Sequence, residues 1–306
     1  MSEGAGIRRS DDGGLTWTDT GFPLPAVSAL STELVAVAPD KLFIGTQLGL
    51  YGYAEDDGWE VVGGGLPAGV AAISPEVGAD GSLRILVGHH GGGQHVYLST
   101  DGGETWTETI SPLPEPADVE ALRLSPSFAT DHTAILAPGW EKPWRTVEGR
   151  PWEEFGPPGE WTVASLQVAP SFDRDGLIFL LLDDGTLRRS RDRGDTWIEL
   201  DGPWGDEVPM SVGPSRGYML EALTFSPAFS EDGVIVTHAG STLYRSTDQG
   251  QTWAEVLALG PSLAHVAFSP GYGQDGGIYL QQGRRLYRSD DRGARWEALP
   301  VAPWDE

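Results

Sequence analysis

Short segments of alternating apolar and polar residues recur along the chain and are separated by clusters of glycine, proline, serine and aspartate. Residues 242–245 and 253–256 are one such pair of segments, with turn-forming residues between them. A period of two predicts strands that bury one face, and the turn residues predict a hairpin. Similar pairs follow one another along the chain. We therefore expect an all-β protein built from hairpins.

The turns of these hairpins carry one repeated pattern, Ser-x-Asp-x-Gly-x-Thr-Trp. It is complete at 10–17, 99–106, 190–197 and 246–253, lacks the threonine at 289–296, and is degenerate at 54–59 and 146–152. The tryptophans of these seven positions are 42, 47, 46, 45, 56 and 43 residues apart. A period of this length indicates a repeat architecture. The defining residues of the five better copies are Ser10, Asp12, Gly14, Trp17, Ser99, Asp101, Gly103, Trp106, Ser190, Asp192, Gly194, Trp197, Ser246, Asp248, Gly250, Trp253, Ser289, Asp291, Gly293 and Trp296.

The chemistry of this pattern is sufficient for a structural role. Serine and aspartate side chains can accept hydrogen bonds from backbone N–H groups that no strand ladder satisfies. The glycine allows a positive φ where the chain reverses. The tryptophan can cover the apolar flank of the hairpin, which contributes about 4–6 kcal/mol before the entropy cost. We therefore predict that the repeated residues support the fold.

The pattern resembles the Asp-box, or BNR repeat, of sialidase-like β-propellers, a superfamily that includes VPS10-like propellers and photosystem II assembly factors. In that superfamily the box connects the third and fourth strands of each blade, on the face away from the ligand site. The resemblance therefore implies a β-propeller in which residues outside the boxes carry the function. The resemblance covers nearly the whole chain.

Seven repeats near 1–25, 27–66, 68–114, 118–157, 162–203, 219–259 and 262–300 are expected to form one domain over residues 1–306. The first has only the last two strands of a blade, near 6–10 and 16–20. We predict a seven-bladed propeller with an incomplete N-terminal blade. The alternative is a six-bladed propeller with an extra N-terminal hairpin that augments the last blade.

A second motif precedes five of the boxes by about 20 residues, at 74–80, 125–131, 169–175, 226–232 and 269–275. It combines a Ser-Pro or Ala-Pro pair, in most copies an aromatic residue, and a final aspartate. Proline suits a connection that needs no ladder donor, and the aromatic ring can close the end of a blade. We interpret this motif as a structural link between strands one and two.

Candidate ligand-binding residues lie on the innermost strands. One face of each aligned strand is small or polar, and three of its residues depart from the small apolar type: Arg123, Gln167 and His265. They are candidates for the central channel, although satisfied structural partners would also explain them.

The connections at the blade ends opposite the boxes hold three further candidates. His89, His90 and His95 form a histidine cluster that could hold zinc or copper, but no carboxylate stands at ligand spacing, and a surface loop is the preferred interpretation. Trp140, Trp144 and Arg145 combine flat aromatic rings with a charge, as a sugar or peptide groove requires. The insertion 201–218, which contains Trp204, could cover the channel mouth. Packing beneath a distorted blade and an inert loop are the structural alternatives for the last two.

Composition narrows the classes of partner. The net charge is −25, from 45 acidic and 20 basic residues, which opposes binding to nucleic acid or anionic membranes. There is no cysteine, and no apolar run approaches a membrane span. The N-terminal residues lack the basic and apolar regions of a signal peptide, so a cytoplasmic location is expected for the sequence as written, or an extracytoplasmic one if the N-terminus is processed.

No catalytic constellation can be assembled from the sequence. A sialidase-like mechanism needs three arginines around a carboxylate, a tyrosine nucleophile with its glutamate, and an acid. Most arginines follow or precede the boxes, and only Arg123, Arg145 and Arg216 could reach the other face. We therefore predict a non-catalytic binding or scaffold module, without cofactor, that engages protein or carbohydrate through the face opposite the boxes. The alternative is a glycoside hydrolase.

Overall fold

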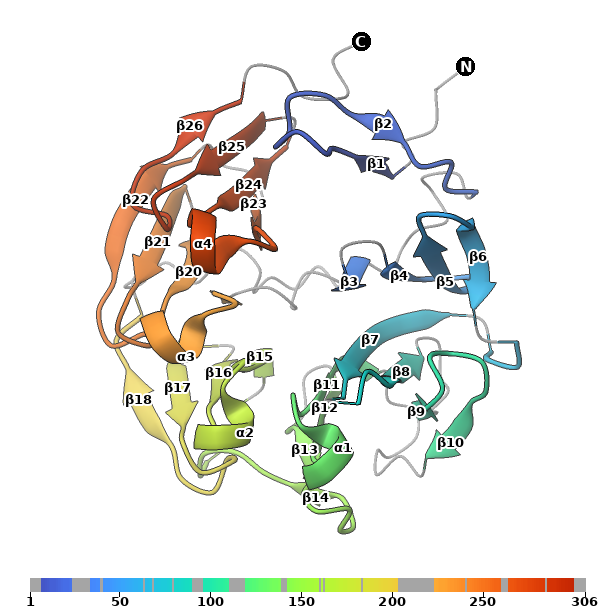
Figure 1. Ribbon diagram of the computed structural model, residues 1–306. Helices are drawn as coiled ribbons and strands as arrows, with labels where there is room; N and C mark the ends of the chain where they lie inside the picture. The colour runs from blue at the N-terminus through green and yellow to red at the C-terminus, as the bar shows by residue number, and fades with distance from the viewer. Residues whose placement is uncertain are drawn as a thin grey trace. The chain divides into compact units, whose positions relative to one another are not determined.

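The computed structural model describes most of the chain (Figure 1). The described residues are 7–23, 34–38, 41–62, 64–67, 69–78, 80–89, 96–109, 119–138, 142–159, 161, 163–182, 184–202, 223–239, 241–259, 264–283 and 285–299. They fall in two compact units. Unit 1 comprises residues 1–9 and 18–155, and unit 2 comprises residues 10–17 and 156–306. The prediction of a single domain over the whole chain stays a prediction.

Unit 1 contains three four-stranded sheets and one two-stranded sheet. The two-stranded sheet joins β1 (Arg8–Arg9) to β2 (Thr18–Asp19). We call the four-stranded sheets blades. The first consists of β3 (Leu34–Ala38), β4 (Lys41–Thr46), β5 (Gly49–Ala54) and β6 (Gly58–Val62), and the second of β7 (Val70–Val77), β8 (Leu83–His89), β9 (Val96–Ser99) and β10 (Thr107–Thr109). The third consists of β11 (Val119–Leu124), β12 (Ala134–Pro138), β13 (Trp144–Thr146) and β14 (Glu153–Glu154).

Unit 2 contains three more blades. They are β15 (Val163–Val168), β16 (Ile178–Leu182), β17 (Leu187–Ser190) and β18 (Ile198–Leu200); β19 (Thr224–Phe225), β20 (Ile235–Ala239), β21 (Thr242–Ser246) and β22 (Ala254–Ala258); and β23 (Ala264–Phe268), β24 (Ile278–Gln282), β25 (Arg285–Ser289) and β26 (Glu297–Ala298). In every blade each strand pairs antiparallel with the next along the chain. The connections between strands one and two and between strands three and four therefore lie at the same end of a blade.

The blade count corrects the sequence-based prediction. Six four-stranded blades are present in the described part of the chain, rather than seven, as the six-bladed alternative expected. The N-terminal hairpin forms a separate two-stranded sheet and adds no strand to the last blade. Within residues 7–23, the described part of the first repeat, two strands form, as expected for an incomplete first repeat.

Both repeated motifs lie where the sequence placed them within a blade. Each box falls in the turn between strands three and four, for example 246–253 between β21 and β22. Four copies of the second motif fold into one-turn helices between strands one and two: α1 (Phe128–Asp131), α2 (Phe172–Asp175), α3 (Phe229–Asp232) and α4 (Tyr272–Asp275) (Figure 1). The copy at 74–80 differs, because β7 continues through Ser74 and Pro75 to Val77 and pairs with β8.

Buried aromatic and aliphatic side chains hold neighbouring blades together within each unit. Phe172, Phe229 and Tyr272 begin their helices and are at most 1% exposed, as expected for rings that close a blade end. Burying a side chain of this size contributes about 2–3 kcal/mol of transfer free energy. In the ranges that the structure describes, no helix is long and apolar enough to span a bilayer.

Candidate functional site

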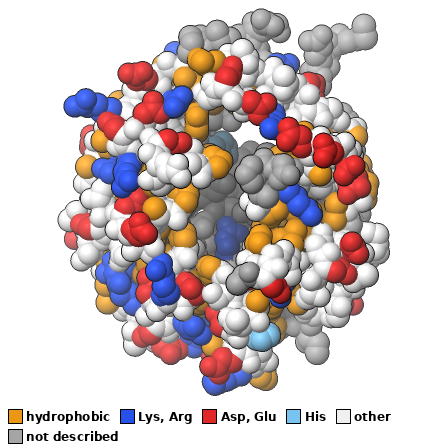
Figure 2. All heavy atoms as spheres, in the orientation of Figure 1, with side chains coloured by type: hydrophobic (Ala, Val, Ile, Leu, Met, Phe, Trp, Pro, Cys, Tyr) orange, Lys and Arg blue, Asp and Glu red, His pale blue; other side chains and the backbone are white. Residues whose placement is uncertain are grey.

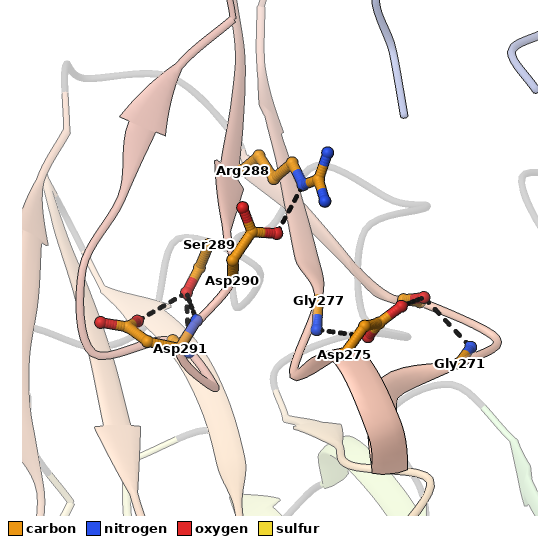
Figure 3. A network of polar contacts seen from close by, with 9 residues as sticks. Gly271, Asp275, Gly277, Arg288, Ser289, Asp290 and Asp291 are labelled. Carbon is orange, nitrogen blue, oxygen red and sulfur yellow. Dashed lines mark hydrogen bonds and ion pairs between the residues drawn. The ribbon is translucent and has the colours of Figure 1, made fainter. Parts of the chain in front are cut away.

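The intact box turns use nearly all of their polar groups within the turn. In the box 246–253, the Ser246 hydroxyl donates to Asp248 Oδ1 (2.8 Å) and accepts the Gly250 N–H (2.9 Å). Asp248 also accepts the backbone N–H of Thr252 (2.8 Å) and its hydroxyl (2.6 Å). The same pattern recurs at 10–17, 99–106 and 190–197, and in part at 289–296, where Ser289 and Asp291 are drawn in Figure 3. The boxes thus behave as closed structural units.

These hydrogen bonds stabilise the ionised form of the box aspartates. The hydroxyl and N–H of Thr16 are the main causes that lower the pKa of Asp12 to about 2, and Thr105 does the same for Asp101. At Asp248, burial opposes the shift, but the hydrogen bonds from Thr252 prevail and the pKa is lowered. A carboxylate with a lowered pKa cannot supply a proton near neutral pH. The box aspartates are therefore unsuited to act as general acids.

The one-turn helices are fastened to the box turns of the same blade. The carbonyl oxygens of Gly176, Gly233 and Gly276, at the helix C-caps, accept N–H groups from Arg193 (3.0 Å), Gln249 (3.1 Å) and Arg292 (3.0 Å). All three donors have φ near +60°, the left-handed conformation that the box turn requires. In the last blade Asp275 accepts the Gly277 N–H (2.7 Å), as Figure 3 shows. In these three blades the helix and the box turn are therefore joined by backbone hydrogen bonds.

In several repeats, the arginine directly before the box serine contacts a different box. For Arg189 and Arg9 this is the next box along the chain, and for Arg288 it is the box of the N-terminal hairpin. In unit 2, Arg189 Nη1 donates to the Gln249 carbonyl (2.8 Å). Arg288 Nη1 approaches Gly13 so closely that a Cβ there would lie 2.8 Å from it. In unit 1, Arg9 forms an ion pair with Glu55 (3.2 Å). The sequence alone predicted no role for these arginines, although their recurrence one residue before the box serine could have indicated one.

Two of the predicted site residues in unit 1 are engaged within their own blade. Trp144 begins β13, is half-buried, and packs against the cluster that contains Leu122 and Leu136. Arg145 donates through Nε to Glu153 Oε1 (2.9 Å), and its guanidinium lies 5.5 Å from the centre of the Phe155 ring. These contacts favour the structural alternative for both side chains.

Arg123 and Gln167 lie on innermost strands, as predicted. Arg123 on β11, in unit 1, is half-buried and donates to the Leu122 carbonyl (2.7 Å). Gln167 on β15, in unit 2, is 8% exposed and lies opposite Phe179 in the ladder.

His265 differs from them in its exposure. On β23, in unit 2, His265 and Ala267 are exposed, whereas Val266 and Phe268 pack into the blade core. The ladder partner of His265 is Gln281 on β24. The alternation that the sequence predicted is thus present on β23, with the His265 side chain on the exposed face.

The histidine cluster is described only in part. His89 ends β8, is 3% exposed, and meets the Tyr97 ring edge-to-face with centroids 5.4 Å apart. His90 and His95 lie outside the described residues, as do Trp140, Trp204 and Arg216. Within the described ranges, no three His, Cys, Asp or Glu side chains are grouped as a metal site would require. The predictions for these residues stay predictions.

Charges are mixed on the face shown in Figure 2. Acidic and basic side chains are interspersed over much of this face, and several acidic side chains lie close together at its upper right.

Comparisons with known proteins agree with the repeat and the fold. A model of the BNR/Asp-box repeat matches residues 97–108 and 244–255. The structure of YCF48 bound to D1 peptide is similar with a TM-score of 0.63 and 15% identity, over 91% of this chain and 84% of that one. An ancestral GH74 enzyme is similar with a TM-score of 0.64 and 14% identity, over 96% of this chain and 43% of that one.

A third similar structure is the extracellular domain of a putative one-component system from B. thetaiotaomicron, with a TM-score of 0.63 and 13% identity, over 93% of this chain and 36% of that one. The chain therefore spans less than half of the last two proteins. At these identities the likeness concerns the fold alone. A comparison with curated protein sequences finds no match. The repeats, the strand topology and the structural neighbours together identify the chain as a β-propeller of the BNR/Asp-box repeat type.

Proposed function

We propose that this protein is a non-catalytic scaffold that binds a protein partner through its innermost strands and the blade ends opposite the boxes. The observation that carries the proposal is the exposed His265 on β23, in a strand whose alternate side chains are buried. An exposed polar side chain on an innermost strand can contact a ligand without disturbing the core.

The residue type at one position of the innermost strands varies between blades, which supports a ligand-binding role for these strands. The position aligned with Ala72 on β7 is Arg123 on β11, Gln167 on β15, Thr224 on β19 and Ala267 on β23. The box turns, in contrast, repeat the same residues, and their side chains form hydrogen bonds within the turn. Residue types that change from blade to blade suit an asymmetric ligand such as a peptide.

The structural neighbours are consistent with a protein ligand. The YCF48 structure is a complex with D1 peptide, so one propeller of this fold binds a peptide. We extend only the class of ligand, a peptide segment of a partner protein, to this chain. Carbohydrate remains the other ligand that flat aromatic and polar side chains could serve.

The glycoside hydrolase alternative requires a carboxyl group with a raised pKa next to a second carboxylate. Every carboxyl pKa shift resolved in the described residues is downward, and the groups concerned lie in box turns, at a helix end or in the β7–β8 turn. These observations favour binding over hydrolysis.

The test is a selection of peptides from a random display library on the intact chain, followed by affinity measurements with the enriched peptide. We expect His265→Ala and Gln167→Ala to weaken binding by about tenfold or more, since each removes a hydrogen-bonding group. A Trp253→Ala variant, still folded at the assay temperature, should bind as the wild type does. Unchanged binding in both innermost-strand variants, or hydrolysis of fluorogenic glycosides by the wild type, would refute the proposal.

A further inference from the structure

The outer strands of the six blades differ in length and regularity. β10, β14, β18 and β26 have two or three residues, whereas β6 and β22 have five. β22 is interrupted, because its register against β21 shifts between Leu243 and Tyr244. β6 pairs with β5 residue for residue, from Leu50 opposite Val62 to Ala54 opposite Gly58. β6 is thus the longest regular outer strand in the described part of the chain.

The second edge of β6 has no strand partner in the ranges that the structure describes. Among the described residues, β6 forms a ladder only with β5. An outer strand presents a row of backbone N–H and C=O groups, and proteins usually protect such edges with short strands, bulges, proline or charge. β6 has neither a bulge nor a proline.

Side chains near both ends of β6 are packed against neighbouring segments, and Val61 between them is exposed. Trp59 donates its indole N–H to Thr20 Oγ1 (3.0 Å) and meets the Phe22 ring at 4.8 Å. Val62 packs so closely on the next box that a Cβ on Gly103 would lie 2.5 Å from it. Val61, between them, is 66% exposed, the highest value among the exposed large hydrophobic side chains. Val61 therefore offers an apolar contact on a strand that is held in place.

The charge of Glu60 is also not neutralised. Two outer-strand glutamates in other blades form ion pairs with the neighbouring third strand: Glu199 with Arg188 (2.9 Å) and Glu153 with Arg145 (2.8 Å). Glu60 lies opposite Gly52, which has no side chain, and no ion pair forms with it in the ranges described. Asp56 and Asp57 add two exposed carboxylates in the turn before the strand.

This local charge selects the kind of strand that can pair with β6. A second copy of the chain would bring the same carboxylates together, on a protein whose net charge is −25. Like charges opposite one another on a sheet are destabilising, whereas opposite charges and apolar pairs stabilise it. A strand with basic residues alternating with apolar ones would place a cation beside Glu60 and an apolar side chain beside Val61.

We propose that the outer edge of β6 binds an extended basic segment of a partner protein by adding it to the blade as a fifth strand. Backbone hydrogen bonds supply the affinity of this mode of recognition, and the alternating side chains supply its specificity. The site is separate from the innermost strands and does not depend on the function proposed for them.

The probe for this site is a fluorescein-labelled peptide of alternating lysine and valine, titrated with the intact chain and followed by fluorescence anisotropy. We expect saturable binding that Val61→Lys and Glu60→Lys each weaken by about tenfold or more, through lost apolar contact and charge repulsion. Because both side chains are exposed, both variants should keep the wild-type melting temperature.

The matched control is Ile198→Lys on the outer strand β18. Ile198 is also an exposed apolar residue, at 51%, but it lies on a three-residue strand whose Glu199 is paired with Arg188. This variant adds the same charge and should bind the peptide as the wild type does. His265→Ala should likewise bind it unchanged, which separates this site from the innermost strands.

A backbone test completes the experiment. The same peptide N-methylated at alternate residues, on the edge that would face β6, should bind at least about tenfold more weakly because it cannot complete the ladder. Hydrogen exchange should slow in residues 58–62 when the unmodified peptide is added. The proposal is overturned if the peptide does not bind, if Val61→Lys binds it normally, or if Ile198→Lys loses as much affinity as Val61→Lys does. It is also overturned if N-methylation of the peptide has no effect, or if β6 instead mediates a dimer that Val61→Lys dissociates.

Discussion

The box turns and the innermost strands differ in how much of their polar chemistry serves the fold. In the box 246–253 a serine and an aspartate satisfy each other and three backbone or hydroxyl donors nearby. On β23, His265 is exposed while its neighbour Val266 packs inward. The serine and aspartate of the box therefore serve the turn, whereas His265 presents its side chain at the surface of its strand.

A substitution in a box should therefore act on stability and leave binding intact. We expect Trp253→Ala to destabilise the protein by about 3 kcal/mol, because the half-buried indole packs against the cluster of Phe179, Phe229 and Ile235. Chemical denaturation measures this loss. A variant with an unchanged unfolding midpoint but no ligand affinity would reverse the roles assigned to the two regions.

Acid should weaken the box turns before it affects the innermost strands. The pKa values of Asp12 and Asp101 are lowered from 3.8 to about 2 by hydrogen bonds to the ionised groups. A group with a lowered folded-state pKa contributes stability above its unfolded pKa and loses it as the pH falls through the folded value. The melting temperature should thus decrease between pH 4 and pH 2, and Asp101→Asn should show a shallower decrease. Identical pH profiles for the two proteins would contradict this account.

Repairing one incomplete motif should add stability at the box end. Ser125, Ser226 and Ser269 each donate to the final aspartate of their motif, whereas the fourth helical copy has Ala169 at this position, before Asp175. We expect Ala169→Ser to stabilise the protein by about 1 kcal/mol through the added hydrogen bond. Ala228→Ser, which lies outside the hydrogen-bonding position, is the control. Destabilisation by Ala169→Ser would show that the buried site cannot accommodate the hydroxyl.

The smallest effect is expected at the C-cap of α1. His132 has φ of 45°, where the other three helices end at Gly176, Gly233 and Gly276. A non-glycine residue in this conformation is strained, so His132→Gly should stabilise the protein by about 0.5–1 kcal/mol. His132→Ala should not, since it keeps a Cβ. Equal stabilities for the two variants would exclude backbone strain as the cause.

The repeat predicted the position of every box and of the helical motif within its blade, because both depend on local hydrogen bonds. The sequence did not predict that 74–77 extends β7 instead of forming a helix. That copy has Val77 where three of the helical copies have phenylalanine and the fourth tyrosine, so it lacks the ring that closes the blade end elsewhere. The predicted number of seven blades was also wrong. The number of boxes gives the number of turns between strands three and four, and not the number of complete blades.

The candidate site was predictable only in part. Period-two alternation correctly predicted the alternating exposure along β23, but the same pattern could not show that Arg145 is held by Glu153. The edge of β6 had no sequence signal of its own, because its availability depends on the length of a ladder and on Gly52 facing Glu60.

The most direct test of the separation between scaffold and site compares two variants in two measurements. For His265→Ala and Trp253→Ala, the affinity for the peptide selected on the wild type and the free energy of unfolding are measured under the same conditions. The account predicts that His265→Ala loses affinity at wild-type stability, and that Trp253→Ala loses stability at wild-type affinity. Loss of affinity in Trp253→Ala, with His265→Ala unaffected, would contradict it.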